Sequence, residues 1–181
     1  MPLKQQCQPK DVTALIRESM ATGKVRTVGL GDMKVCTSPS DMLVTYSLGS
    51  CVGVSICDPE AGVGGLIHCM LPLSKRSPEK AANRPHIFVD TGVVSLLKGM
   101  FQKGARRENL VIKAGGGSEL LDKKQLFRVG HRNYAVLRKI MWKNDLLIDE
   151  ADVGGTKSRT MYLHVGSGTT VIKSEGEFRL L

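Results

Sequence analysis

The feature that most constrains the fold is a pair of apolar segments separated by a short turn. The segments CVGVSIC (51–57) and VGGLIHCML (63–71) are rich in valine, isoleucine and leucine. The sequence between them, DPEAG (58–62), contains the Asp, Pro and Gly that are typical of tight turns. Apolar runs of this length bounded by turn residues favour strands, so the sequence predicts a β-hairpin.

This hairpin brings a cysteine and a histidine together. If Pro59 and Glu60 form a two-residue loop, Cys51 lies directly opposite His68 on the neighbouring strand. A bulge at Gly62 would shift the register by one residue and still leave the two side chains within reach of each other. We therefore expect the thiol of Cys51 and the imidazole of His68 to be neighbours.

The rest of the chain predicts two core helices against many short strands. Apolar residues recur at helical spacing in 89–101 and 131–144, and a polar segment with two prolines, 74–85, predicts a long surface loop. The irregular order of strands and helices argues against a doubly wound parallel sheet. We expect an α/β (α+β) fold, a layered sandwich of mixed β-sheets flanked by helices. The predicted strands lie within 25–46 and at 51–57, 63–71, 110–118, 146–152, 159–165 and 169–173.

Length and patterning predict one domain with an N-terminal extension. A chain of 181 residues fits a single domain. Residues 11–22 have apolar side chains at helical spacing between Asp11, a candidate N-cap, and Gly23, a candidate stop. We expect residues 1–24 to form an extension with an amphipathic helix and residues 25–181 to form the domain itself.

Composition narrows the setting in which the protein acts. No segment has the roughly 18 consecutive apolar residues of a membrane span, and the N-terminus lacks the apolar run of a secretory signal. Five cysteines, an odd number, fit a reducing compartment better than a disulfide scaffold. We therefore expect a cytoplasmic protein without membrane insertion. The net charge of +9 implies an acidic partner, but the basic residues form no long run with interleaved aromatics, so we expect no nucleic-acid binding.

A cysteine beside a histidine indicates thiol-dependent hydrolysis. The thiolate is the nucleophile, and a thiol with a pKa near ~8.5 needs a neighbouring base at neutral pH. His68 is the candidate base for Cys51. The glycine turn Leu48-Gly49-Ser50, directly before the cysteine, can expose the thiol and direct backbone N–H groups toward a developing oxyanion. Gly49 and Ser50 are therefore candidate cleft residues.

Several motifs make this interpretation more specific. VTYSLGSCVGVSICDP (44–59) followed by GGLIHCMLP (64–72) resembles the signature of the CheD family, the chemoreceptor glutamine deamidases of bacterial chemotaxis. The resemblance covers roughly residues 25–175. Further landmarks of that family appear in order: FVDTG (88–92), IKAGGGS (112–118), VGHRN (129–133) and DVGGTKSR (152–159).

The resemblance implies a site, a substrate and partners. In that family the cysteine, the histidine of the next strand and a threonine six residues before the cysteine form a catalytic triad, matched here by Cys51, His68 and Thr45. The implied reaction hydrolyses glutamine side chains of methyl-accepting chemoreceptor cytoplasmic domains to glutamate, which becomes a methylation site, without a cofactor or metal. The implied protein partner is a CheC-type response-regulator phosphatase. The family fold resembles that of the cytotoxic necrotising factor toxins, a sandwich of β-sheets with helices on one side.

Other interpretations stay open at the level of sequence. The chain could serve chiefly as a non-catalytic regulatory partner of the phosphatase. The same cysteine and histidine could also support peptide cleavage or transglutamination. A zinc site built from Cys51, Cys57, His68 and Cys69 is a weaker alternative, because the paired short cysteine spacings of structural zinc sites are missing.

Overall fold

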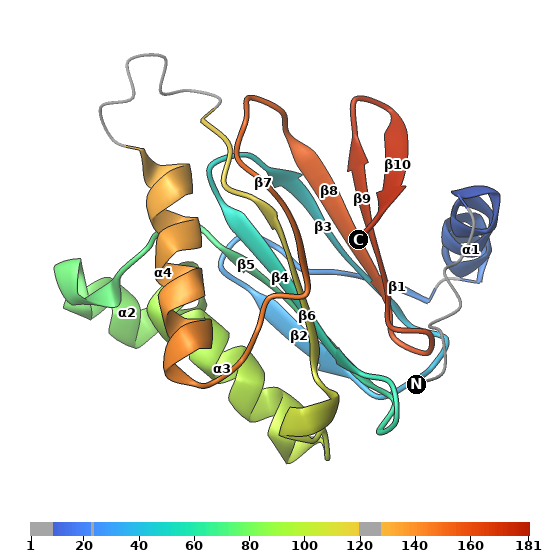
Figure 1. Ribbon diagram of the computed structural model, residues 1–181, viewed down its shortest axis with the longest axis horizontal. Helices are drawn as coiled ribbons and strands as arrows, with labels where there is room; N and C mark the ends of the chain where they lie inside the picture. The colour runs from blue at the N-terminus through green and yellow to red at the C-terminus, as the bar shows by residue number, and fades with distance from the viewer. Residues whose placement is uncertain (1–8, 23, 120–127) are drawn as a thin grey trace.

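Two five-stranded β-sheets packed face to face form the centre of the protein (Figure 1). The structure, a computed structural model, describes residues 9–22, 24–119 and 128–181. The predicted layered α+β sandwich is confirmed. Helices cover both outer faces of the sandwich, however, whereas the family resemblance placed them on one side only. In the described part of the chain, no helix is long and apolar enough to cross a membrane.

The first sheet has the strand order β1-β3-β8-β9-β10. β1 pairs with β3 in parallel, and every other pair in this sheet is antiparallel, so the sheet is mixed as predicted. The final strand, β10, lies beyond the last predicted strand and was missed by the sequence analysis. The strands are β1 (Val25–Thr27), β3 (Met42–Leu48), β8 (Arg159–His164), β9 (Thr169–Ser174) and β10 (Glu177–Leu180).

The second sheet has the order β2-β5-β4-β6-β7 and is also mixed, because β6 and β7 pair in parallel. Every residue of β4 and β5 is buried, since these strands have the first sheet on one face and helices on the other. The strand predicted at 146–152 begins later. The strands are β2 (Met33–Cys36), β5 (Val63–Cys69), β4 (Val52–Asp58), β6 (Val111–Gly116) and β7 (Glu150–Val153).

The β4–β5 hairpin is confirmed, but its predicted register is wrong. Asp58 pairs with Val63, so the loop has four residues rather than two. The Asp58 carboxylate accepts hydrogen bonds from two N–H groups of the loop, at 2.9 and 3.0 Å, and Gly62 closes the loop with a φ of +64°. As a result, the residue opposite His68 is Gly53, and not Cys51.

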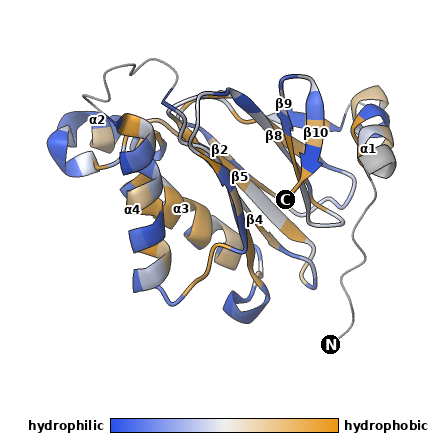
Figure 2. Ribbon diagram, turned by 45° about the horizontal axis from the view of Figure 1, so that its top comes forward, coloured by the Kyte–Doolittle hydropathy of each residue, from blue (hydrophilic) through white to orange (hydrophobic). Residues whose placement is uncertain are grey.

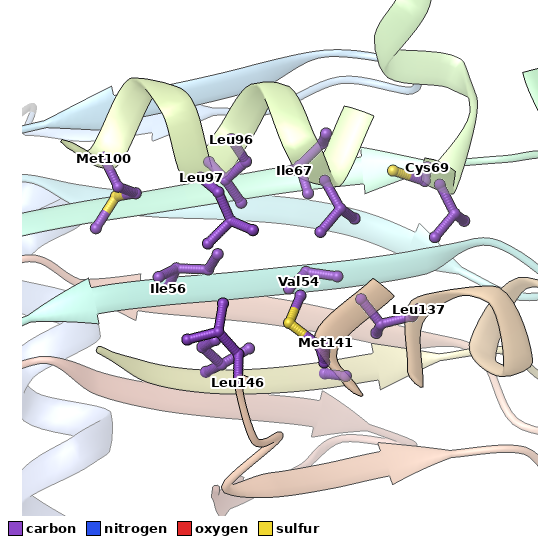
Figure 3. Packing of buried hydrophobic residues seen from close by; sticks show 14 of the residues in the cluster. Val54, Ile56, Ile67, Cys69, Leu96, Leu97, Met100, Leu137, Met141 and Leu146 are labelled. Atoms are coloured by element: carbon purple, nitrogen blue, oxygen red, sulfur yellow. The ribbon is translucent and has the colours of Figure 1, made fainter. Parts of the chain in front are cut away.

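Helices α3 (Val89–Gln102) and α4 (Val129–Lys143) cover the outer face of the second sheet, close to the predicted ranges. Hydrophilic and hydrophobic segments alternate along α4 (Figure 2), as expected for a helix with one face on a sheet. Figure 3 shows side chains of both helices meeting those of β4 and β5 in one apolar layer. This layer includes Val54, Ile56, Ile67, Leu96, Leu97, Met100, Leu137 and Met141.

The N-terminal helix α1 (Pro9–Ala21) packs on the outer face of the first sheet. Its Val12 and Ile16 are buried in a cluster with residues of β3, β8 and β9. The predicted stop, Gly23, lies outside the described residues, as do the side-chain contacts of Asp11. Packing on this sheet gives the helix a structural role.

The predicted loop at 74–85 is partly wrong, because short helical turns interrupt it. They are η1 (Ser74–Arg76), α2 (Pro78–Asn83) and η2 (Pro85–Ile87), which leads directly into α3. Another turn, η3 (Arg107–Asn109), precedes β6. The prolines at the start of α2 and η2 suit the first position of a helix, where no N–H donor is needed.

Candidate active site

Cys51 lies where the chain crosses from the first sheet to the second. β3 ends at Leu48, and β4 begins directly after Cys51. The pairing of β3 with β8 shifts between Thr45 and Leu48, which marks a β-bulge, and Ser47 has a φ of +58°. Such bulges redirect a strand and often lie next to active sites. Cys51 is partly buried and packs against the cluster between the two sheets.

His68 lies diagonally across the hairpin from Cys51. Because Gly53 is opposite His68, Cys51 and His68 occupy neighbouring positions on the same face, with no side chain on the intervening Gly53. The backbone of His68 also forms hydrogen bonds with the segment before β2. Its N–H donates to the Asp32 carbonyl at 3.1 Å, and its carbonyl accepts from the Gly31 N–H at 2.9 Å. Cys51 and His68 therefore still face the same side of the hairpin, although no hydrogen bond joins them.

Thr45 determines which nitrogen of the His68 ring carries the proton. The Thr45 hydroxyl donates to the Val28 carbonyl at 2.8 Å, and its Oγ1 lies 2.8 Å from Nδ1 of His68. A hydroxyl has a single proton, and a carbonyl oxygen can only accept, so Oγ1 accepts from a protonated Nδ1. Nε2 is therefore the unprotonated nitrogen. It is buried and has no hydrogen-bond partner among the described residues, so the Cys51 thiol does not donate to it in this structure.

Burial favours the neutral form of both side chains. It lowers the pKa of His68 to about 4 and raises the pKa of the Cys51 thiol, although the N–H of Cys51 beside its own sulfur acts in the opposite direction. At neutral pH these shifts favour a thiol and a neutral imidazole over a thiolate and an imidazolium.

The buried imidazole should also make stability depend on pH. The unfolded chain binds a proton at His68 below its ordinary pKa of ~6.5, whereas the folded chain does so only near pH 4. Between these pH values the unfolded chain binds more protons, so the free energy of unfolding decreases as the pH falls. We expect His68 to account for about 1–2 kcal/mol of lost unfolding free energy between pH 7 and pH 5. Urea unfolding of the native chain and of His68→Gln at both pH values measures this. Equal losses in the two proteins would contradict it.

The glycine motif at 112–118 supports the turn that carries Cys51. Gly117 N–H donates to the Cys51 carbonyl at 2.7 Å, and Ser118 N–H donates to the Gly49 carbonyl at 2.8 Å. A Cβ on Gly116 would lie 2.3 Å from the Cys51 carbonyl oxygen, and its φ is +101°. Only glycine fits such a position. The motif therefore supports the turn through its backbone.

Asn133 of α4 supports the same turn and was not singled out by the sequence analysis. Its Nδ2 donates to the Ser50 carbonyl at 2.8 Å and to the Met70 carbonyl at 3.0 Å. The close approach of α4 depends on Gly130, where a Cβ would lie 2.4 Å from the Gly117 carbonyl oxygen. The signal in the sequence was the VGHRN motif, whose function the residue pattern alone did not reveal.

Two further motifs, FVDTG and DVGGTKSR, hold segments near the site through hydrogen bonds. The Asp90 carboxylate accepts hydrogen bonds from the N–H and hydroxyl of Ser74 at 2.8–3.0 Å, which anchors the segment after β5. Arg159 binds Asp152 through two donors at 2.8 and 3.0 Å and donates to the Ser118 hydroxyl at 2.6 Å. FVDTG thus anchors the segment after β5, and DVGGTKSR reaches the turn through Ser118, whose N–H binds the Gly49 carbonyl.

The predicted cleft residues, Gly49 and Ser50, lie in the turn before Cys51, but the N–H of Gly49 is not free to bind an oxyanion. Gly49 N–H already donates to the Ser47 carbonyl at 2.9 Å, so it belongs to the turn itself. This leaves the N–H groups of Ser50 and Cys51 as candidate oxyanion donors. The zinc alternative finds no support, because Cys69 packs on the opposite face of β5 from His68. In the ranges that the structure describes, no three His, Cys, Asp or Glu side chains cluster as metal ligands would.

Comparison with known proteins agrees with the geometry. The family model for CheD chemotactic sensory transduction matches residues 70–174, more than half of the chain. The probable chemoreceptor glutamine deamidase CheD of Solibacter usitatus is 43% identical over 150 residues, which cover 83% of this chain and 89% of that protein. The chain belongs to the CheD family. A second member, the probable chemoreceptor glutamine deamidase CheD 1 of Syntrophus aciditrophicus, is 41% identical over 149 residues, 82% of this chain and 93% of that protein.

The candidate triad lies within the part shared with the CheD relatives. A continuous stretch of 150 residues in a chain of 181 includes residues 32–150, and therefore Thr45, Cys51 and His68. Among solved structures, the hypothetical protein YfiH of Bacillus licheniformis matches with a TM-score of 0.42 and 11% identity, covering 69% of this chain and 51% of that one.

Proposed function

We propose that this CheD-family chain is a chemoreceptor glutamine deamidase that uses Cys51 as nucleophile, His68 as proton carrier and Thr45 as the residue that orients the imidazole. The observation that carries the proposal is the hydrogen-bond chain from the Val28 carbonyl through Thr45 to Nδ1 of His68, which leaves Nε2 unprotonated. His68 and Cys51 face the same side of the hairpin. The relatives, named as probable chemoreceptor glutamine deamidases, support the substrate.

The proposed reaction has two stages. Nε2 of His68 takes the thiol proton as the sulfur attacks the carboxamide carbon, and the N–H groups of Ser50 and Cys51 stabilise the oxyanion. The imidazolium then gives its proton to the leaving nitrogen, ammonia departs and a thioester remains on Cys51. In the second stage, His68 activates water, which hydrolyses the thioester to glutamate and restores the thiol.

The setting of the reaction follows from its substrate. Methyl-accepting receptors present their glutamines on cytoplasmic domains, so we place the chain in the cytoplasm. Residues 25–181 form the catalytic unit in this proposal, because every site residue lies within them, and residues 1–24 form an extension. The CheC-type phosphatase partner rests on the family resemblance alone. The non-catalytic alternative is less well supported, because it gives no role to the ordered Thr45–His68 pair.

The test is to incubate the protein with a purified chemoreceptor cytoplasmic fragment and map the peptides. We expect specific glutamines to gain about one dalton each as amide becomes acid, with one ammonia released per conversion. Broken peptide bonds would indicate a peptidase, and a joined amine would indicate a transglutaminase. An unchanged fragment would reject the proposed function.

Thr45→Val tests the effect of the Thr45 hydroxyl on the rate while the shape of the side chain stays the same. Valine fills the same space but cannot accept from Nδ1, so the imidazole is no longer held in its productive tautomer. We expect kcat to fall about 10- to 100-fold with little change in KM. Thr45→Ser keeps the hydroxyl and should stay within about threefold of the native kcat. Equal losses in the two variants would remove Thr45 from the mechanism.

A further inference from the structure

Asn133 bridges two chain segments on either side of the thiol. It is fully buried in α4, and both protons of its amide nitrogen are used, one on the Ser50 carbonyl and one on the Met70 carbonyl. Continuing the β4–β5 register by one position would place Cys51 opposite Met70. Strand pairing stops before that position, and Asn133 spans the place where the next pair would form.

The bond to Ser50 also fixes the direction of the next N–H group. The Ser50 carbonyl and the Cys51 N–H belong to one trans peptide unit, so they point in opposite directions. Because the carbonyl faces Asn133 and α4, the Cys51 N–H faces away from α4. The same N–H lies beside the sulfur of Cys51, where it acts to lower the pKa of the thiol against the larger effect of burial. The N–H thus points to the side on which a reacting carbonyl must lie.

The neighbouring peptide units are fixed by backbone donors. Ser118 N–H holds the Gly49 carbonyl, and Gly117 N–H holds the Cys51 carbonyl. Between them, the Ser50 carbonyl is held by a side chain, and this support can be removed by mutation. The Oδ1 atom of Asn133 has no hydrogen-bond partner among the described residues, so its two donors account for its anchoring.

We propose that Asn133 is a positioning residue that presets the oxyanion-binding N–H of Cys51. This inference rests on the proposed thiol mechanism but not on the identity of the substrate. Asn133 touches neither the substrate nor the sulfur. Its effect passes through the Ser50 peptide unit, so losing it should impair reactions that form an oxyanion and spare reactions of the thiol that do not.

Two small reagents separate these cases without any receptor. With p-nitrophenyl acetate, the Cys51 sulfur attacks the ester carbonyl, an oxyanion forms, p-nitrophenolate leaves and the thiol proton is lost to base. With iodoacetamide, the sulfur displaces iodide from carbon and no oxyanion forms. Peptide mapping after timed quenching gives both rates at Cys51 in the full chain, whatever the other cysteines do.

We expect Asn133→Ala to lower acylation at Cys51 by at least about tenfold, while alkylation stays within about threefold of the native rate. Leu137→Ala is the matched control, because Leu137 is buried on the same helix one turn later and contacts the apolar layer instead of the turn. It should leave both rates nearly unchanged. If Asn133→Ala does not fold, Asn133→Ser replaces it, since the shorter hydroxyl leaves room for water between the two carbonyls.

An unchanged ratio of acylation to alkylation in the Asn133 variant would overturn the proposal. This includes equal losses of both rates, which would show that the thiol is displaced and not that an N–H donor is lost. These outcomes are independent of the receptor assay. A changed ratio without receptor deamidation would reject only the proposed substrate, and deamidation with an unchanged ratio would reject only the role of Asn133.

Discussion

Replacing Cys51 by alanine is expected to lower receptor deamidation by at least about 10³-fold, because the proposed thioester forms on the Cys51 sulfur. The substitution removes only a sulfur atom from a partly buried position, so the fold should be retained. Peptide mapping of the receptor fragment over time gives the rate, and urea unfolding gives the stability of the variant.

Cys57→Ala is the matched control for Cys51→Ala. Cys57 lies in β4 itself, at the end remote from Cys51, and is buried in the cluster between the sheets against which Cys51 packs. Its loss should cost about 1 kcal/mol of stability and leave the deamidation rate within about threefold of native. Residual activity above about a tenth in Cys51→Ala, or an equal loss in Cys57→Ala, would contradict the assignment of the nucleophile.

Replacing His68 by glutamine is expected to lower kcat by about 10²- to 10⁴-fold, because the imidazole transfers a proton in both stages of the reaction. For alkylation of Cys51, in contrast, the neutral state of both side chains predicts almost no effect of the same substitution. Since an uncharged imidazole does not stabilise a thiolate, the rate of Cys51 with iodoacetamide at neutral pH should change by less than about threefold. The two assays on one variant therefore test both the role of His68 and its charge.

His164→Gln supplies the control for this experiment. His164 lies on β8 and is bound to Ser167 of the following turn, away from the candidate site. Its replacement should leave turnover and alkylation unchanged. If His68→Gln lowered alkylation as strongly as turnover, the resting pair would be a thiolate and an imidazolium, in conflict with the direction of both pKa shifts.

Local patterns were enough to predict the elements that bring the site together. The apolar runs of β4 and β5 and the helical spacing of α3 mark elements that bury a wide apolar surface, and such patterns are strong. β10 was missed because exposed charged residues alternate with half-buried apolar ones, a pattern that many edge segments share. The turns within 74–85 were missed because they bury little of their surface.

The register of the hairpin shows where local reasoning fails. The sequence offered Pro59 and Glu60 as a two-residue loop, whereas the Asp58 carboxylate stabilises a loop of four by accepting from two N–H groups. Because a shift of two positions keeps a side chain on the same face, Cys51 and His68 still face the same way.

Asn133 could not be assigned from the sequence for a different reason. Its partners, Ser50 and Met70, are 83 and 63 positions away along the chain, and only the folded arrangement of α4 over the hairpin brings them together. No spacing rule links residues at such distances. The same holds for Thr45, whose catalytic role the sequence suggested through family resemblance alone and whose contact with His68 depends on the packing of two sheets.

The most direct test of the account is to trap the thioester on Cys51. Hydroxylamine added during turnover attacks a thioester and leaves a γ-glutamyl hydroxamate on the substrate in place of glutamate. We predict that the native protein forms hydroxamate at the same receptor glutamines that it deamidates, and that Cys51→Ala forms neither product. Glutamate formation without hydroxamate at high hydroxylamine concentration, or product formation by Cys51→Ala, would contradict a covalent role for Cys51.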